Sequence, residues 1–573
     1  MYFINTLSSA LIVISAVWTT SVIGVEQVSI NSLPAVNPVK QPWIWPLPQH
    51  WDRGQKTLDA SHIGFDYSHH NSILSKAIKR YTDDIFYLKD DYPMVPYNWS
   101  TTDSKITGQL RTVKIILDNA DDTKLDLDTD ESYELTIPSG NKARATLKAK
   151  NVYGALHGLE TLSQIIQWSP ENRRHLIPNA PWSIKDKPKY AYRGLLMDTS
   201  RHYYPLEDIK KTIETMAWNK MNAFHWHMLD STSFPYESKA YPELSKKGAY
   251  SPKHVYSAED LAEIVQFAKE RGVRVIPEIE APGHSTSWGY GIPEIVSCRD
   301  KVPYFGYTVQ PPSGQLNIAS NKTKEVVHAI VDEFVDIFPD SFFHASGDEV
   351  VYDCWSNDTE IAKYLKDNDM TVQELFSDFV LEMQDYIRSK NRTVIAWQES
   401  VLEYNLTLPK NTVIQTWDGS DGVKGATEKG YRTIVSSNNY WYLDVGFGKP
   451  RSNPYPDVAG AGFNHWNRMY SYDMRANLTS SEIELIIGGE AAVFGELIDH
   501  TNFESRIWPR ASTVAHVLWS GYENPEGEKL TSEDAILRLF PWRERMLLRG
   551  TMASPLNQGF CTRNPLDCFQ PPE

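Results

Sequence analysis

Two adjacent carboxylates, Asp348 and Glu349, follow the apolar run 341–345, which is typical of a β-strand. Side chains along a strand alternate between its two faces, so neighbouring acids can share one pocket only where the strand has ended. Gly347, directly before the pair, gives the backbone the freedom to turn there. An isolated pair of this kind is more often the solvated start of a loop than a catalytic site. Polar residues at corresponding positions elsewhere in the chain favour the catalytic interpretation.

Other side chains with catalytic or ligand-binding chemistry also follow β-prone runs. They are Arg201, Asp230, His284, Trp397, Trp417, Tyr442 and Glu496. A guanidinium such as that of Arg201 could pair with a strand-end acid or could bind vicinal sugar hydroxyls. Trp397 and Trp417 could be packing residues, or together they could wall a small apolar pocket. His284 fits better as a proton-tuning neighbour of Glu349 than as a core histidine.

The acid pair suits the hydrolysis of a glycoside, which needs a proton for the leaving oxygen and stabilisation of a positively charged sugar carbon. We expect Glu349 to be the proton donor. Asp348 stands next to this acid rather than across the sugar, so it is poorly placed for backside attack. A substrate whose own 2-acetamido group is the nucleophile avoids this difficulty, because the second carboxylate then orients the amide N–H. The pair therefore favours substrate-assisted hydrolysis.

His225 and His227 stand two residues apart on one predicted strand, a spacing that occurs in metal sites. They leave open a second hypothesis, a metal-dependent amidohydrolase. The fifth and sixth predicted strands are not followed by a histidine, so core packing is the better explanation, and neither a metal nor a cofactor is expected. Glu399 and Glu490 are further acids near strand ends, which we interpret as structural. A third hypothesis is a catalytically silent sugar-binding barrel, although such a protein would not need both acids of the pair.

Eight β-prone runs alternate with amphipathic segments in the later part of the chain. The predicted strands are 192–198, 222–229, 273–280, 341–345, 393–397, 412–417, 431–436 and 484–489, and the predicted helices include 206–219, 258–271, 323–338 and 371–390. This repeat predicts a (β/α)8 TIM barrel, in which catalytic residues collect at the carboxyl ends of the strands.

The earlier part of the chain shows α+β patterning. Strand-like runs cover 113–117 and 132–137, a helix with one apolar face is predicted over 151–168, and the Pro-containing stretch 179–188 reads as a linker. We therefore predict a smaller N-terminal α+β domain at residues 25–190 and a catalytic barrel at 191–573.

Residues 1–24 read as a secretory signal peptide. The apolar stretch 7–18 is too short to span a bilayer, and small residues follow it; an uncleaved anchor is the alternative. No later segment is apolar enough to cross a membrane. The length of 573 residues suggests two or more domains, and the formal net charge of −16 argues against nucleic acid and acidic lipids as partners. We expect a lysosomal or secreted protein.

Four cysteines and six glycosylation sequons agree with a secretory chain. The sequons start at Asn98, Asn321, Asn357, Asn391, Asn405 and Asn477. Cys561 and Cys568 most simply close a C-terminal loop, which would leave Cys298 to pair with Cys354, although three pairings are open.

A set of motifs in this order resembles glycoside hydrolase family 20, the β-N-acetylhexosaminidases, and in particular the lysosomal-type animal enzymes. The motifs are Arg193 to His202, Asn222 to Asp230, Pro282-Gly283-His284 with Trp288, His344 to Val350, Trp397-Gln398-Glu399, Trp441-Tyr442-Leu443-Asp444 and Gly488-Gly489-Glu490-Ala491. The resemblance runs from Trp43 to Cys561, and the family's disulfide pattern agrees with the simplest pairing above. One departure is Ser346, which stands where the family's His-x-Gly-Gly-Asp-Glu-Val motif has its first glycine.

The resemblance implies an exo-acting, retaining enzyme that removes terminal β-linked N-acetylglucosamine or N-acetylgalactosamine from a glycan or glycoconjugate. The implied catalytic residues are Glu349 as general acid/base, Asp348 as the partner of the acetamido nitrogen and Tyr442 as the donor to the acetamido oxygen. The implied substrate-binding residues are Trp397 and Trp417 around the acetamido methyl, Arg201 and Glu496 at the distal hydroxyls, Asp230 and His284 behind the acid, and also Asp444 and Phe494.

Two details of the resemblance concern substrate choice and assembly. The family usually has a Trp as the floor of the sugar site, so Phe494 predicts weaker binding with the chemistry retained. The Asp444-Val445 pair resembles the subunit type that prefers neutral sugars. Family members are often dimers, which makes a homodimer one possibility.

Overall fold

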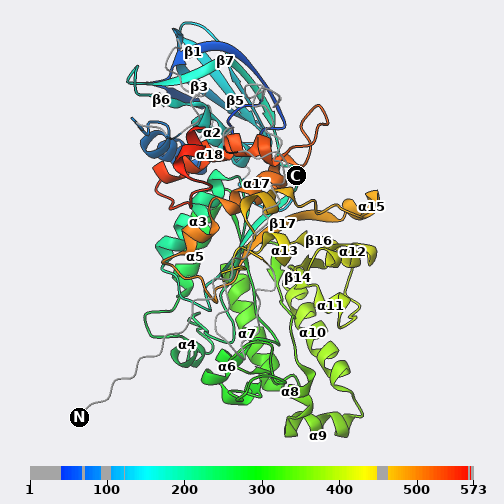
Figure 1. Ribbon diagram of the computed structural model, residues 1–573. Coiled ribbons are helices and arrows are strands. Elements are labelled where there is room, and N and C mark those ends of the chain that lie inside the picture. Colours follow the sequence, from blue (N-terminus) through cyan, green and yellow to red (C-terminus); the bar gives the residue numbers. More distant parts are fainter. Residues whose placement is uncertain are drawn as a thin grey trace, which may run out of the picture. The chain divides into compact units, whose positions relative to one another are not determined.

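Eight parallel strands form a barrel in the computed structural model (Figure 1). They are β8 (Tyr192–Asp198), β9 (Ala223–His227), β10 (Arg274–Pro277), β13 (Phe342–His344), β14 (Thr393–Trp397), β15 (Val413–Thr416), β16 (Arg432–Val435) and β17 (Ile486–Val493). Neighbours in sequence pair with one another, and β17 pairs with β8. A bridge between Glu278 and His344 brings β10 against β13 and closes the ring. The predicted (β/α)8 barrel is confirmed.

The structure describes residues 41–67, 71–91, 94, 105–121, 123–447, 462–564 and 568. All of them belong to one compact unit, Gln41–Glu573. The predicted signal peptide and the sequon at Asn98 lie outside the described residues.

Helices follow the barrel strands, and their ends are set by the sequence. The longer ones are α3 (Leu206–Trp218), α5 (Ala258–Lys269), α7 (Asn321–Ile337), α9 (Thr359–Asn368), α10 (Val372–Ser389), α12 (Asp421–Glu428), α17 (Arg510–Ser520) and α18 (Ser532–Leu548). Ser257 with Asp260 and Thr371 with Glu374 form capping boxes that fix the starts of α5 and α10. The predicted helices start and end within about two residues of these bounds.

Shorter elements lie in the connections between the strands and in the segment after β17. They are η4 (Pro293–Ile295), β11 (Val296–Ser297), β12 (Gln315–Leu316), α4 (Glu243–Gly248), α6 (Thr286–Gly291), α8 (Tyr352–Ser356), α11 (Glu399–Leu402), α13 (Asn438–Trp441), α14 (Trp466–Ser471), α15 (Ser480–Ile483), α16 (Phe503–Ile507) and α19 (Gly559–Arg563). No helix in these described ranges combines the length and the apolar character needed to cross a membrane.

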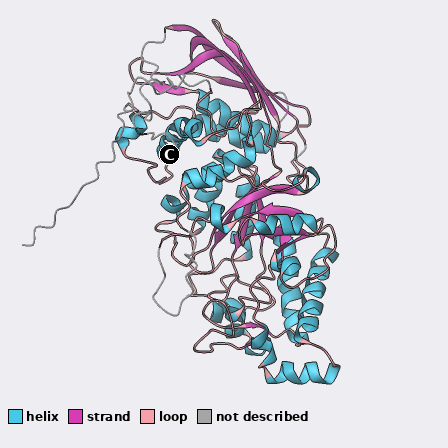
Figure 2. Ribbon diagram, turned by 45° about the vertical axis from the view of Figure 1, so that its right-hand side comes forward, coloured by secondary structure: helices cyan, strands magenta, loops and turns pink. Residues whose placement is uncertain are grey.

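A second, mixed sheet precedes the barrel, with helices on one of its faces (Figure 2). Its strands are β1 (His50–Asp59), β2 (Gly64–Tyr67), β3 (Ile106–Leu117), β4 (Tyr133–Ile137), β5 (Ala143–Ala149), β6 (Gln167–Ser169) and β7 (Arg174–Asp186), and its helical segments are α1 (Ser72–Arg80), η2 (Tyr81–Ile85) and α2 (Val152–Ile165). This confirms the N-terminal α+β part. Every residue of α2 is buried, rather than one face, because α2 lies between the sheet and the α18 end, where Arg549 pairs with Glu160 at 3.0 Å.

The predicted linker 179–188 was wrong, because residues to Asp186 belong to β7. This strand pairs with both β1 and β4 and alternates buried and exposed side chains from Trp182 onward. The prolines of this stretch, Pro181 and Pro188, indicated a linker. Pro181 stands where the β1 register is irregular, so its missing N–H group breaks no regular ladder, and Pro188 follows the strand.

The predicted end of the last barrel strand was also wrong. The predicted strand ended at Gly489, yet β17 continues to Val493 beside β8. A Cβ at Gly488 would lie 1.8 Å from the Tyr192 carbonyl oxygen, so glycine is needed here for close strand packing rather than for a turn. Glu490 therefore lies inside the barrel and not past its end.

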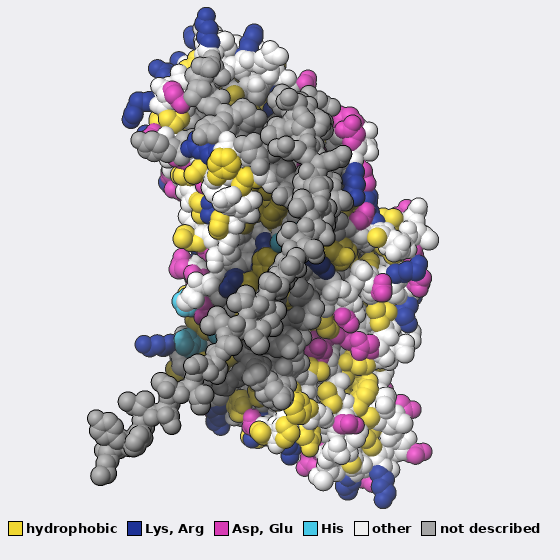
Figure 3. Space-filling model, in the orientation of Figure 1, with side chains coloured by type: hydrophobic (Ala, Val, Ile, Leu, Met, Phe, Trp, Pro, Cys, Tyr) yellow, Lys and Arg dark blue, Asp and Glu magenta, His cyan; other side chains and the backbone are white. Residues whose placement is uncertain are grey.

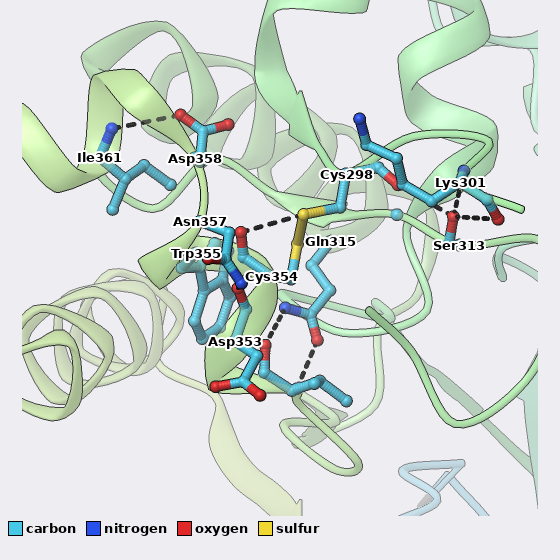
Figure 4. The surroundings of a disulfide bond; sticks show 12 residues. Cys298, Lys301, Ser313, Gln315, Asp353, Cys354, Trp355, Asn357, Asp358 and Ile361 are labelled. Atoms are coloured by element: carbon cyan, nitrogen blue, oxygen red, sulfur yellow. Dashed lines mark hydrogen bonds between the residues drawn. A yellow bond between two sulfur atoms is a disulfide. The ribbon is translucent and has the colours of Figure 1, made fainter. Parts of the chain in front are cut away.

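Both predicted disulfides are present, Cys298–Cys354 and Cys561–Cys568. Figure 4 shows the first, which joins the start of the 298–314 loop to α8, directly after the acid pair. Gln315 supports the same junction, because its side chain donates to the Val351 carbonyl at 3.1 Å and accepts from the Val351 amide at 2.6 Å.

On the face in Figure 3, acidic and basic side chains are mixed over the described residues.

Candidate active site

One pocket lies at the carboxyl ends of the barrel strands. It is lined by Arg201, His227, Asp230, Glu280, His284, Gln310, Asp348, Glu349, Trp397, Trp417, Asn438, Tyr442, Asp444, Val445, Phe494 and Glu496. Every residue of the predicted catalytic and substrate-binding sets is among them. The fold therefore brings these side chains together, and their individual roles stay predictions.

The backbone after β13 turns so that both acids of the pair face this pocket. Ser346, Gly347 and Glu349 have φ angles of 45°, 92° and 49°, so three of four consecutive residues are left-handed. Such angles disfavour residues that carry a Cβ and persist only where the surroundings enforce them. The predicted turn is present, and its strained residues with a Cβ are Ser346 and Glu349, on either side of Gly347 and Asp348.

His284 connects the acids. Its Nε2 lies 3.0 Å from Glu349 Oε2 and 3.9 Å from Asp348 Oδ2, and its Nδ1 lies 4.0 Å from Asp230 Oδ2. Burial lowers the pKa of His284, but the hydrogen bond to Glu349 and the charges of Asp230 and Asp348 outweigh burial and raise it to about 9. The imidazole is therefore cationic at neutral pH and sits among three carboxylates.

Asp348 is held in the pocket by a neighbour in sequence. Its side chain is 16% exposed, and the Ser346 hydroxyl donates to its Oδ1 at 2.9 Å. Burial raises the pKa of Asp348, the cationic His284 opposes this, and the neighbouring Glu349 adds to the rise. The ionised form of Asp348 thus depends on His284 and on the Ser346 hydroxyl.

Arg201 meets acids from several strand ends. Its Nη1 lies 2.9 Å from Asp230 Oδ2 and 3.2 Å from Asp198 Oδ2, while its Nη2 lies 4.0 Å from Glu496. Burial alone would raise the pKa of Asp230, but Arg201 and His227 hold it down at about 2. Arg201 is therefore an ion-pair partner of strand-end acids that also lines the pocket, and its binding of sugar hydroxyls stays a prediction.

Two acids near Arg201 have a different character from Asp230. Asp444 accepts a hydrogen bond from the Phe494 amide at 3.3 Å, and burial followed by the charge of Glu496 raises the pKa of Asp444 to about 8. The pKa of Glu496 is also raised, chiefly by burial. At acidic pH these groups can both donate and accept hydrogen bonds, as binding of sugar hydroxyls requires.

Aromatic side chains form the apolar wall of the pocket. Tyr442 lies 6.4 Å from Trp417 and 5.6 Å from Phe494 between ring centroids, and Trp397 belongs to the same apolar cluster. The indole nitrogens are anchored by acids outside the lining: Trp397 donates to Glu278 at 3.0 Å and Trp417 to Glu399 at 2.8 Å. The hydrogen bond from Trp417 agrees with the interpretation of Glu399 as a structural residue.

The two strand histidines have different surroundings. His225 is buried inside the barrel between Glu490 at 2.9 Å and Glu278 at 3.1 Å, which fits the predicted core packing. Glu490 also accepts from the Tyr192 hydroxyl at 2.6 Å. His227, in contrast, lines the pocket and lies 3.2 Å from both Asp230 and Arg201. Core packing was thus wrong for His227, because its strand ends there.

Sequence reasoning missed His227, Glu280, Gln310 and Asn438 as pocket residues. Glu280 follows β10 by three residues, so the strand-end rule could have found it. Gln310 comes from the 298–314 loop and accepts from Arg201 Nη2 at 3.2 Å. No periodicity marks a position within such a loop.

Two models of known protein families match this chain. Residues 190–522 match the model described as "Glycosyl hydrolase family 20, catalytic domain", and residues 44–165 match "beta-acetyl hexosaminidase like". The chain belongs to glycosyl hydrolase family 20.

Individual relatives cover nearly the whole chain. Beta-hexosaminidase 1 of Arabidopsis thaliana is 35% identical over 563 residues, spanning 94% of this chain and 95% of its own. Beta-hexosaminidase subunit beta of Homo sapiens is 32% identical over 578 residues, spanning 97% and 96%. The solved Flavobacterium johnsoniae chitobiase is 26% identical with a TM-score of 0.68, spanning 88% of this chain and 73% of that chain.

The activity of the chain is that of an exo-acting β-N-acetylhexosaminidase, a glycosidase that removes terminal β-linked N-acetylhexosamine. The amidohydrolase and the silent sugar-binding barrel are not supported by these matches.

Proposed function

We propose that the pocket hydrolyses its glycoside by a retaining, substrate-assisted route in which Glu349 is the acid and base and Asp348 manages the acetamido group. The observation that supports this most is the opening of both acids into one pocket that also contains Trp397, Trp417 and Tyr442. An acetamido group needs such a mixture, because it carries an N–H donor, a carbonyl acceptor and an apolar methyl.

In the first step the acetamido oxygen forms a bond to C1 while the bond from C1 to the leaving oxygen breaks. Protonated Glu349 gives its proton to that oxygen, and Asp348 accepts the amide N–H and balances the oxazolinium charge. Tyr442 donates to the acetamido oxygen. In the second step water attacks C1, its proton passes to Glu349, and the bond between C1 and the acetamido oxygen breaks.

The other pocket residues hold the sugar in place. Arg201 and Glu496 lie at one polar side, where the distal hydroxyls would bind, and Asp444 lies beside them. Cationic His284 and ionised Asp230 stand behind Glu349 and adjust its proton transfer. Phe494 offers the ring on which the sugar packs, with Arg201 Cζ 5.5 Å from its centroid.

The test is Glu349→Gln assayed on acetamido glycosides with poor and good leaving groups. We expect a loss of about 100- to 10,000-fold for the poor leaving group and a much smaller loss for the good one, because a good leaving group needs no proton. Glu360, an exposed residue of α9, provides Glu360→Gln as the matched control, with wild-type rates expected. Equal losses on both substrates would contradict the acid role. Indifference to a thiazoline mimic of the cyclised intermediate would contradict the acetamido nucleophile.

We also propose three features outside the pocket. The chain divides into an N-terminal domain at residues 25–190 and a barrel domain at 191–573, it enters the secretory pathway, and it forms a homodimer. The N-terminal sheet ends at Asp186 and the barrel begins at Tyr192. Two disulfides support passage through an oxidising compartment, to a lysosome or to secretion, and the five sequon asparagines among the described residues are exposed. A mass decrease on treatment with an N-glycosidase would test the route, and size-exclusion chromatography would test the dimer.

A further inference from the structure

Ser346 stands between β13 and the acid pair, and both its backbone and its side chain are unusual. Its φ of 45° lies in the left-handed region, where glycine would be at ease and a residue with a Cβ is not. The residue is fully buried. We propose that Ser346 is a positioning residue, whose hydroxyl orients the Asp348 carboxylate toward the acetamido group and keeps it ionised. The inference rests on the proposed role of Asp348.

The contacts of Asp348 make this hydroxyl important. Ser346 Oγ donates to Asp348 Oδ1 at 2.9 Å, whereas His284 Nε2 is 3.9 Å from Oδ2, beyond hydrogen-bond distance. Within the described part of the chain, no other hydrogen bond to this carboxylate is present. Without Ser346 Oγ the carboxylate would be free to rotate within the pocket.

The backbone around Ser346 is fixed on both sides. Its carbonyl accepts from the Trp397 amide at 3.2 Å, which ties the turn to β14. Its amide donates to His344 Nδ1 at 3.1 Å, so both backbone polar groups of Ser346 are held. A side chain that occupies such a strained, buried position is explained if its polar group is used.

The charge of Asp348 depends on its surroundings. The groups that act on it come from the residues after β10, β13, β14 and β16: they are Glu278, Glu280, His284, Glu349, Glu399, Tyr404 and Tyr442. Burial and the neighbouring acids raise the pKa of Asp348, while His284 and Ser346 lower it. Loss of the hydroxyl should raise that pKa further.

The test compares Ser346→Gly and Ser346→Ala with the wild type, using a 4-nitrophenyl N-acetyl-glucosaminide across acidic to neutral pH. We expect kcat to fall by about 10-fold or more in both variants, as for loss of a hydrogen bond to a charged group, with a smaller change in KM. The acid limb of the kcat profile should move to higher pH, because Asp348 must be ionised. Ser346→Gly should melt no lower than the wild type, since glycine removes the strain.

Two further variants identify the route of the effect. Ser400→Ala is the matched control. Ser400 is a buried serine beside the same turn, and its Oγ lies 3.2 Å from the position that a Cβ at Gly347 would take. Wild-type kinetics are expected for this variant. In the Asp348→Asn background, Ser346→Gly should cause no further loss, because the hydroxyl acts through Asp348.

An unshifted acid limb in Ser346→Gly, or equal losses with and without Asp348, would overturn the inference. The same assays separate it from the proposed function. If the wild-type enzyme is insensitive to the thiazoline mimic, the acetamido mechanism fails. If it is inhibited and Ser346→Gly behaves as wild type, only the positioning role fails.

Discussion

Single carboxylates in the pocket differ in charge because their neighbours differ. Asp230 is buried, yet Arg201 and His227 hold its pKa at about 2, so it is ionised at any working pH. Asp444 is also buried, but burial and Glu496 raise its pKa to about 8, so it is protonated in an acidic compartment. The same residue type thus provides a fixed anion beside Arg201 and His227 and a group near Glu496 that can donate a hydrogen bond.

His284 makes the stability of the fold depend on pH. Its pKa is raised from 6.5 to about 9, so its contribution is fully present below pH 6.5 and is lost as the pH rises to 9. A shift of this size corresponds to roughly 3 kcal/mol. We expect His284→Asn to have a smaller fall in melting temperature between pH 6.5 and 9 than the wild type.

Thermal unfolding followed by circular dichroism at several pH values checks this expectation. The exposed His254, on the connection before α5, provides His254→Asn as the control, and its curve should run parallel to that of the wild type. Parallel curves for His284→Asn and the wild type would contradict the prediction.

Phe494 belongs to the apolar lining of the pocket, and its effect on the strength of sugar binding stays a prediction. A larger ring at this position should lower KM in Phe494→Trp by about 2- to 10-fold, as for an added aromatic contact of roughly 0.5–1.5 kcal/mol, with little change in kcat. Phe494→Leu should raise KM. Steady-state kinetics on one substrate at fixed pH measure both variants, and an unchanged KM in both would show that the sugar does not pack on this residue.

At the scale of elements, strand ends were predictable and loop positions were not. Strong periodicity and the abrupt polar residues after each run located all eight barrel strands, and hence Arg201, Asp348 and Tyr442. Prolines caused the end of β7 to be predicted as a linker, although Pro181 stands where the register is irregular, and β17 extends past the predicted end at Gly489 because Gly488 allows close packing on β8. Gln310 enters the pocket from a loop whose path depends on a disulfide and on tertiary contacts, so no local pattern could reveal it.

The Cys298–Cys354 disulfide joins that loop to the helix after the acids. The two cysteines are 56 residues apart in sequence, and a disulfide that closes a loop of this length typically stabilises the folded state by about 2–4 kcal/mol. We expect the double variant Cys298→Ser and Cys354→Ser to melt at a lower temperature and to have a higher KM, because Gln310 and the acids lose their common anchor.

The second disulfide is the matched control for this experiment. Cys561 and Cys568 are separated by 7 residues and close a small C-terminal loop away from the pocket lining. Their double serine variant should keep the wild-type KM. A normal KM in the Cys298 and Cys354 variant would show that the loop needs no covalent anchor.

At the scale of the whole molecule, the N-terminal sheet and the barrel share buried charges. Arg193 of β8 pairs with Glu131 at 2.6 Å, and Lys220, just before β9, pairs with Asp186 of β7 at 3.0 Å. The Arg193 and Lys220 side chains are fully buried. We therefore expect the barrel to depend on these acids, and the parts on either side of the predicted boundary near residue 190 to stabilise one another.

Asp186→Asn tests this dependence with little change in shape. Lys220 Nζ also contacts Tyr133 and Thr161 at 3.0 Å, but these neutral groups cannot balance its charge. Removing one partner of a buried ion pair typically costs about 3–5 kcal/mol. The control is Glu134→Gln, which breaks the ion pair between Glu134 and Lys185. Their side chains are 54% and 66% exposed, so this loss should cost less than about 0.5 kcal/mol. Denaturant unfolding measures both, and similar midpoints would show that the barrel does not rely on the sheet.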